Sequence, residues 1–129
     1  MTFRIDRLDH VVINCRDAEA SGAWYERVLG MTRERYGSEG RLALKFGEQK
    51  FNLRPTGTDG WETAREDVPG SLDLCFVTRS SLDAVEAHLR ACGIAIVDGP
   101  IARSGALGPI TSVYFHDPDG NLLEVATYG

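Results

Sequence analysis

Four polar residues stand in stretches that otherwise read as apolar strands, and their side chains are types that bind metal ions. The stretches are LDHVVINC, QKFNLRP, SLDLCFV and NLLEV, and the residues are His10, Asn52, Asp73 and Glu124. A carboxylate among apolar neighbours is costly to bury unless a partner or a ligand compensates its charge. An imidazole, two carboxylates and an amide oxygen that converge on one point would form a site for a divalent cation.

An internal duplication predicts how these residues come together. Residues 8–31 and 71–94 each read as an apolar run of strand length, a polar break, a helix and a closing glycine. The same shift of 63 positions (10 to 73, 17 to 80, 30 to 93) aligns three pairs of landmarks, which are His10 with Asp73, the predicted helix N-caps Asp17 and Ser80, and the glycines Gly30 and Gly93. Asp and Ser are favoured at helix N-caps, and glycine is favoured just past the end of a helix, so these two landmark types have a physical reason for their places.

Strand-like segments follow each predicted helix. In the first half they are residues 32–37, 40–47 and 49–55; in the second they are 95–100, 110–116 and 121–127, with a long loop at 101–109 and the turn DPDG at 117–120. The chain therefore reads as one domain, residues 1–129, made of a βαβββ module at 4–54, a polar linker at 55–70 and a second βαβββ module at 71–128. The predicted fold class is α+β, with two tandem modules packed into a curved mixed sheet that encloses a cleft.

The duplication relates the four polar residues in pairs. His10 and Asp73 begin the first strands of the two modules, and Glu124 in the last strand of the second module corresponds to Asn52 in the first. If the paired sheets curl round a cleft, an approximate two-fold axis brings all four from four strands to one point.

Composition narrows the class of protein. The net charge of −5 and the pI near 5.1 argue against a nucleic-acid partner, which usually requires a basic face. The cysteines Cys15, Cys75 and Cys92 show no CxxC spacing, so we expect small apolar fillers rather than disulfides or a zinc cluster. No run of residues is apolar enough for a membrane span, and the N-terminus has no secretory h-region, so we expect a cytoplasmic protein.

The motifs LDHVVINC, WYERVLGM and YFHDPDGNLLEV are similar to those of the vicinal oxygen chelate (VOC) superfamily. That superfamily includes glyoxalase I, fosfomycin-resistance enzymes, bleomycin-resistance proteins and type I extradiol dioxygenases. The resemblance covers residues 4 to 128. Within the superfamily, KFGEQKFNLRP, VPGSLDLCFVT and GPIARSGALGPITSVYF resemble a small glyoxalase-domain or virulence-protein subgroup, a label that does not fix a substrate. The resemblance implies paired modules, a metal in the cleft and frequently a homodimer.

The resemblance also implies roles for particular residues. His10, Asp73 and Glu124 match the metal ligands, and Glu124 is the candidate catalytic base. Asp73 departs from the usual histidine, and Asn52 occupies a position that holds a ligating glutamate in some glyoxalases, so Asn52 is expected to contact substrate. Ser112 and Tyr114 match substrate-facing positions. Arg103, in the predicted loop, is a candidate to hold an anionic group. One imidazole and two carboxylates favour Mn²⁺, Fe²⁺, Ni²⁺ or Mg²⁺ over Zn²⁺.

Two classes of function follow. The first is a metal-dependent lyase, isomerase or dioxygenase that chelates two vicinal oxygens of a small, oxygen-rich molecule. The second is a metal-free protein that sequesters a drug-like molecule, as bleomycin-resistance proteins do; Asp73 and Asn52 keep this reading open.

Structural roles remain as alternatives for individual residues. His10 could be hydrogen-bonded to the backbone at a strand start, and Asp73 could cap a turn. Tyr114 could be a core or dimer contact. Glu124 could form an ion pair with Arg41, Arg54 or Arg103. Trp61, in the linker, is either a lid over the cleft or an anchor for the linker.

Overall fold

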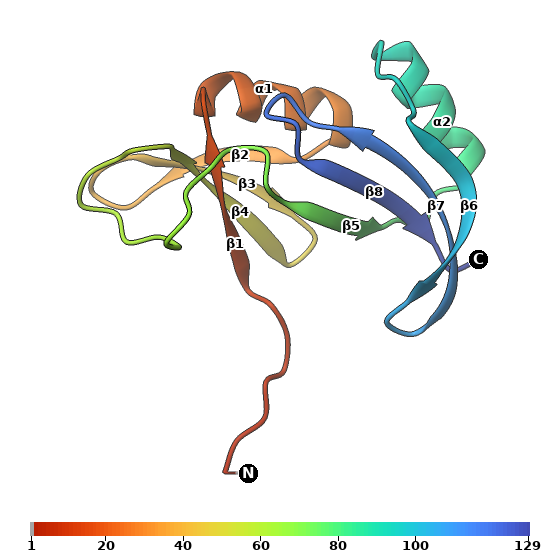
Figure 1. Cartoon of the computed structure of the whole chain (residues 1–129), viewed down its shortest axis with the longest axis horizontal. Coiled ribbons are helices and arrows are strands. Elements are labelled where there is room, and N and C mark those ends of the chain that lie inside the picture. The colour runs from red at the N-terminus through yellow and green to blue at the C-terminus, as the bar shows by residue number, and fades with distance from the viewer. Residues whose placement is uncertain (1) are drawn as a thin grey trace. The chain divides into compact units, whose positions relative to one another are not determined.

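The computed structural model describes residues 2–129, which form two helices and eight strands in two mixed four-stranded sheets (Figure 1). The chain divides into two compact units, Met1–Val68 and Pro69–Gly129. Each unit has the order βαβββ and its own sheet. The predicted α+β class with two tandem βαβββ modules is therefore confirmed.

The first unit contains the three strands predicted after its helix. Its elements are β1 (His10–Cys15), α1 (Ala18–Leu29), β2 (Thr32–Tyr36), β3 (Arg41–Phe46) and β4 (Gln49–Pro55). The sheet order is β1-β4-β3-β2, with β1 parallel to β4 and the other neighbours antiparallel.

Local chemistry sets the two ends of α1, and packing decides which face of the sheet it covers. The Asp17 carboxylate accepts a hydrogen bond of 3.0 Å from the Ala20 N–H, and the helix ends at Gly30, whose φ of 67° favours glycine. The ring of Tyr25 on α1 lies 5.8 Å from that of Phe51 on β4. Because side chains alternate along a strand, the even-numbered residues of β4, including Asn52, lie on the opposite face.

The second unit repeats this arrangement. Its elements are β5 (Asp73–Val77), α2 (Leu82–Ala91), β6 (Asp98–Gly105), β7 (Gly108–His116) and β8 (Leu122–Thr127). The sheet order β5-β8-β7-β6 has the same pattern as in the first unit, with one parallel pair followed by two antiparallel pairs. Figure 1 shows the helix of this unit beside the β6–β7 side of its sheet.

Two sequence predictions about the second unit were wrong. The N-cap of α2 is Ser81, whose hydroxyl accepts from the Ala84 N–H, and not Ser80. The predicted loop at 101–109 is mostly strand: β6 runs through Gly105, and only Ala106 and Leu107 separate it from β7. Arg103 therefore lies on a strand. The pairing of β6 with β7 also contains a register shift, between Asp98 and Ile101.

The DPDG turn is held by a buried network of hydrogen bonds. Asp117 Oδ1 accepts from the N–H groups of Asp119 and Asn121, and Asn121 Nδ2 donates to Asp117 Oδ2 at 2.7 Å. Asn121 Oδ1 also accepts from the Leu72 N–H at 2.9 Å, which ties the start of β5 to the start of β8. Asn121 is only 1% exposed, so these bonds form out of contact with water.

Candidate functional site

In the first unit, His10 and Asn52 lie on the sheet face opposite α1. Val12 on β1 pairs with Asn52 on β4, and His10 precedes Val12 by two residues, so both side chains share a face. Asn52 is buried, and its Oδ1 has no hydrogen-bond partner among the described residues. A buried amide oxygen without a donor is costly, so this atom is suited to a ligand.

The ring of His10 is oriented by its neighbour Asp9. Its Nδ1 lies 2.9 Å from Asp9 Oδ1, and this hydrogen bond lowers the pKa of the Asp9 carboxyl. In a neutral imidazole, a carboxylate at Nδ1 favours the proton on that nitrogen, which leaves the lone pair of Nε2 for a metal ion. Asp9 was not among the predicted site residues; its position directly before His10 was the available signal.

In the second unit, Asp73 and Glu124 share a face of the sheet. Cys75 on β5 pairs with Glu124 on β8, and Asp73 precedes Cys75 by two residues on the same face. Partial desolvation of the Cys75 thiol, together with the nearby charge of Glu124, raises its pKa to about 11. Cys75 is exposed and Cys15 is buried, so the expectation of an apolar filler describes Cys15 and not Cys75.

Glu124 is buried and receives hydrogen bonds rather than an ion pair. Its Oε2 accepts from the hydroxyl of the fully buried Ser112 at 2.5 Å. The three arginines considered as ion-pair partners form their ion pairs with other carboxylates, namely Arg41 with Glu39, Arg54 with Asp67 and Arg103 with Asp98.

Tyr114 links Glu124 to Arg103. Tyr114 on β7 pairs directly with Glu124 on β8, so the two side chains are neighbours on one face. Arg103 Nε donates to the Tyr114 hydroxyl at 3.0 Å, and Arg103 lies near Asp98, with a nitrogen–oxygen distance of 3.6 Å. Desolvation is the main cause that raises the pKa of Tyr114.

The donor types fit a hard divalent ion, although no complete cluster is present. Across the described residues 2–129, no three His, Cys, Asp or Glu side chains form a group that could hold a metal ion. The first unit supplies an imidazole nitrogen and the amide oxygen of Asn52, and the second supplies the carboxylates of Asp73 and Glu124. Oxygen and imidazole donors suit Mn²⁺, Fe²⁺, Ni²⁺ and Mg²⁺. The convergence of all four residues stays a prediction.

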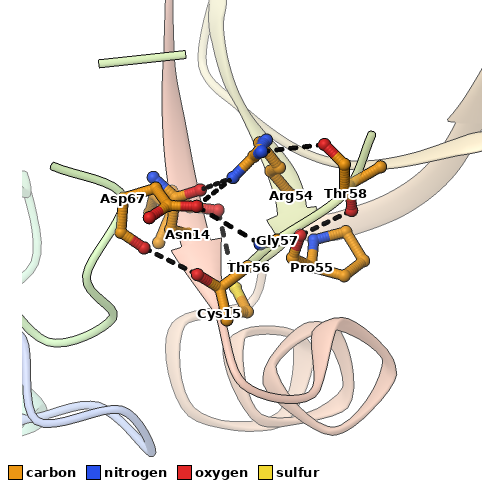
Figure 2. Close-up of polar contacts among 9 residues, drawn as sticks. Asn14, Cys15, Arg54, Pro55, Thr56, Gly57, Thr58 and Asp67 are labelled. Carbon is orange, nitrogen blue, oxygen red and sulfur yellow. Dashed lines mark hydrogen bonds and ion pairs between the residues drawn. The ribbon is translucent and has the colours of Figure 1, made fainter. Parts of the chain in front are cut away.

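A buried arginine on the first sheet holds the linker in place, a role that the sequence did not reveal. Figure 2 shows Arg54 in contact with Asn14, Asp67 and Thr58. Its Nη1 donates to Asn14 Oδ1 at 2.8 Å and to Asp67 Oδ2 at 3.0 Å, and its Nη2 donates to the Thr58 carbonyl at 2.9 Å.

Trp61 also anchors this linker, as one of its two predicted roles required. Its ring centroid lies 4.0 Å from the Arg41 guanidinium carbon, which is the geometry of a cation–π contact.

Residues 7–125 match the family model of the Glyoxalase/Bleomycin resistance protein/Dioxygenase superfamily. The chain belongs to this superfamily, whose fold is the VOC fold. It is 46% identical over 121 residues to glyoxalase domain-containing protein RDO1 of Mycosarcoma maydis, covering 94% of this chain and 68% of that protein. It is 42% identical over 124 residues to virulence protein STM3117 of Salmonella typhimurium, covering 96% of this chain and 85% of that protein.

Solved structures agree with this assignment. Integron cassette protein VCH_CASS1 from the mobile metagenome of V. cholerae superposes with a TM-score of 0.96 at 44% identity, with 100% of both chains covered. Fosfomycin resistance protein FosX from Listeria monocytogenes, complexed with Mn(II) and sulfate, shares the fold at a TM-score of 0.68 and 17% identity, covering 96% of this chain and 91% of that one. No helix among the described residues is long and apolar enough to cross a membrane.

Proposed function

We propose that this protein is a divalent-metal-dependent VOC enzyme that acts on two vicinal oxygens of a small substrate. His10, Asp73 and Glu124 would hold the ion, and Asn52 would contact the substrate. The observation that carries the proposal is Glu124: its carboxylate is buried, receives a hydroxyl hydrogen bond, and has no ion pair recorded among the described residues. An uncompensated buried carboxylate is costly, and a bound cation offsets that cost.

The chain's own groups suit proton transfer beside a polarised oxygen. A divalent ion, when bound, acts as a Lewis acid on the substrate oxygens. Glu124 is the base at this site, because its carboxylate is the acceptor that faces the hydroxyls of Ser112 and Tyr114. Those two hydroxyls keep Glu124 in place. The reaction class is therefore that of a lyase, isomerase or dioxygenase, and the partner is a small oxygen-rich molecule.

Sequestration of a small molecule without a metal is the second candidate. Two positions favour it: Asn52 offers an amide where a carboxylate would bind a metal more strongly, and Asp73 is a short side chain at an exposed strand start. In that case the unpartnered Asn52 Oδ1 would accept a hydrogen bond from the bound molecule.

Elemental analysis of protein purified without chelators or a metal-affinity tag tests the proposal. About one Mn, Fe, Ni or Mg per chain is expected in the wild type, with loss of the ion in His10→Ala and Glu124→Gln. Glu48→Gln, at an exposed turn position of the first unit, is the matched control and should keep its metal. A wild type that takes up no metal after reconstitution with each ion would exclude the enzyme proposal and leave sequestration.

A further inference from the structure

The hydrogen bonds around Tyr114 can run in only one direction. A guanidinium group has donors and no acceptor, so in the 3.0 Å contact between Arg103 Nε and the Tyr114 oxygen the phenol must accept. The single hydroxyl proton of Tyr114 is then available to a different acceptor. Glu124, which pairs with Tyr114 across β7 and β8, supplies a carboxylate that can only accept when ionised.

Arg103 is itself held in place from three sides. Its Nη2 lies 3.6 Å from Asp98 Oδ2, its Nη1 donates to the Ala102 carbonyl at 3.2 Å, and its guanidinium carbon is 5.5 Å from the centroid of the Tyr114 ring. All three nitrogens therefore have partners within the second unit. The sequence suggested that Arg103 would hold an anionic group of the substrate, and that role stays a prediction.

We propose that Arg103, supported by Asp98, is a positioning residue that directs the Tyr114 proton toward Glu124 and toward any ligand bound beside it. The hydrogen bonds run from Arg103 to the Tyr114 oxygen and from the Tyr114 hydroxyl to Glu124, whose other neighbour Ser112 also donates. A ligand acceptor oxygen, such as a carbonyl, alkoxide or carboxylate oxygen, would have to compete with Glu124 for this single proton. The last step rests on the proposed function, whereas the direction of the proton does not.

The test is the exchange rate of the Tyr114 hydroxyl proton in the metal-free full chain. Tyrosine labelled with ¹³C at the ring carbon that bears the hydroxyl gives one signal for each of the four tyrosines. The Tyr114→Phe variant identifies the signal of Tyr114. In a mixture of H₂O and D₂O, the protonated and deuterated forms of a tyrosine hydroxyl give separate signals when the hydroxyl exchanges slowly. A split signal therefore reports that the hydroxyl proton is held in a hydrogen bond.

In the wild type we expect slow exchange at Tyr114. Arg103→Met and Glu124→Ala should each speed the exchange of the Tyr114 hydroxyl proton about fivefold or more, since each variant removes one of the two hydrogen bonds of the Tyr114 hydroxyl. Arg103→Lys should restore part of the protection, and Asp98→Asn should have a smaller effect. The signals of the other three tyrosines serve as controls for the fold.

Two outcomes would overturn the inference. Exchange at Tyr114 as fast as in free tyrosine would show that the proton is not held. Acceleration by Arg103→Met but not by Glu124→Ala would show that Glu124 is not the acceptor. Because the protein carries no metal in this experiment, neither outcome depends on the elemental analysis that tests the proposed function.

Discussion

Cys75 reports directly on the charge of Glu124. Partial desolvation and the neighbouring carboxylate raise the pKa of the thiol to about 11, and only the thiolate is a good nucleophile. We therefore expect Cys75 to react with iodoacetamide at pH 8 at least about tenfold more slowly than an unhindered cysteine peptide. The rate should rise with pH up to the raised pKa, as followed by mass spectrometry of the Cys75 peptide.

The Glu124→Gln variant separates the two causes of this shift. Loss of the Glu124 charge should lower the pKa of Cys75 and speed its alkylation. Partial desolvation of the thiol should still keep the alkylation rate below that of the cysteine peptide. Ser104→Ala, at an exposed position of β6, is the control and should alkylate like the wild type. Equal rates for wild type and Glu124→Gln would contradict the register that places Glu124 beside Cys75.

Asn121 is a structural residue of the motif that resembles the superfamily's usual ending. Asn121→Ala removes two hydrogen bonds in a buried region, from Asn121 Nδ2 to Asp117 Oδ2 and from the Leu72 N–H to Asn121 Oδ1, which should lower the free energy of unfolding by about 1–3 kcal/mol. Urea denaturation of this variant and of the exposed control Ser104→Ala measures the difference. A change below about 0.5 kcal/mol would mean that water replaces both lost bonds.

An ion pair between Arg54 and Asp67 is one of the contacts that hold the linker after β4 in place. Hydrogen bonds from Arg54 and from the Gly57 N–H lower the pKa of Asp67 below its usual value of 3.8. Because the unfolded chain then takes up the proton first, the stabilisation from this carboxylate is complete above that usual value and is lost as the pH falls through the lower folded value.

Asp67→Asn should therefore destabilise the protein near pH 7 and have little effect near pH 2. Paired urea titrations at the two pH values give the difference in unfolding free energy between variant and wild type. Glu66→Gln, the exposed neighbour, is the control and should show no such pH dependence. A loss of stability in Asp67→Asn that is equal at both pH values would show that the Asp67 charge does not act through Arg54.

Strand positions were predictable where local signals were strong. The alternation of apolar and polar residues and the glycine turns located β2, β3 and β4, and DPDG located the turn before β8. A strand was predicted at 95–100, but β6 runs through Gly105; residues 101–105 were predicted as loop because an edge strand tolerates glycine and proline, and because the pairing with β7 is decided by contacts distant in sequence. Gly99 shows this: a Cβ there would lie 2.2 Å from the Ser112 carbonyl oxygen, a constraint that becomes visible only once β7 is in place.

For the candidate site, too, features set by local sequence were predictable and features set by distant contacts were not. The duplication placed His10, Asn52, Asp73 and Glu124 on their strands, and the alternation of Ser112 and Tyr114 put both on one face. The partners of these residues depend on strand register, which the sequence does not show. The contacts of Cys75 with Glu124 and of Arg103 with Tyr114 were therefore not predictable, nor was the burial of Arg54 beneath its linker.

The segment before β1 exposes three large apolar side chains. Phe3, Ile5 and Leu8 are 63%, 79% and 65% exposed, and Figure 1 shows this segment extending away from β1. Large apolar side chains gathered on an exposed segment commonly mark an interface. We therefore expect a homodimer, as predicted from the superfamily resemblance, with these residues buried against the partner.

Sedimentation equilibrium of the wild type and of a Phe3→Ser/Ile5→Ser variant checks this expectation. A dimer of the 14.2 kDa chain should be present at micromolar concentration, and the double substitution should raise its dissociation constant at least tenfold, since burying each side chain contributes about 1.5–3 kcal/mol. Leu107→Ser is the matched control, because Leu107 is 88% exposed at the tip of the β6–β7 hairpin, away from this segment in the sequence. An unchanged dimer in the double variant would place the interface elsewhere, whereas a monomeric wild type would contradict the expected homodimer.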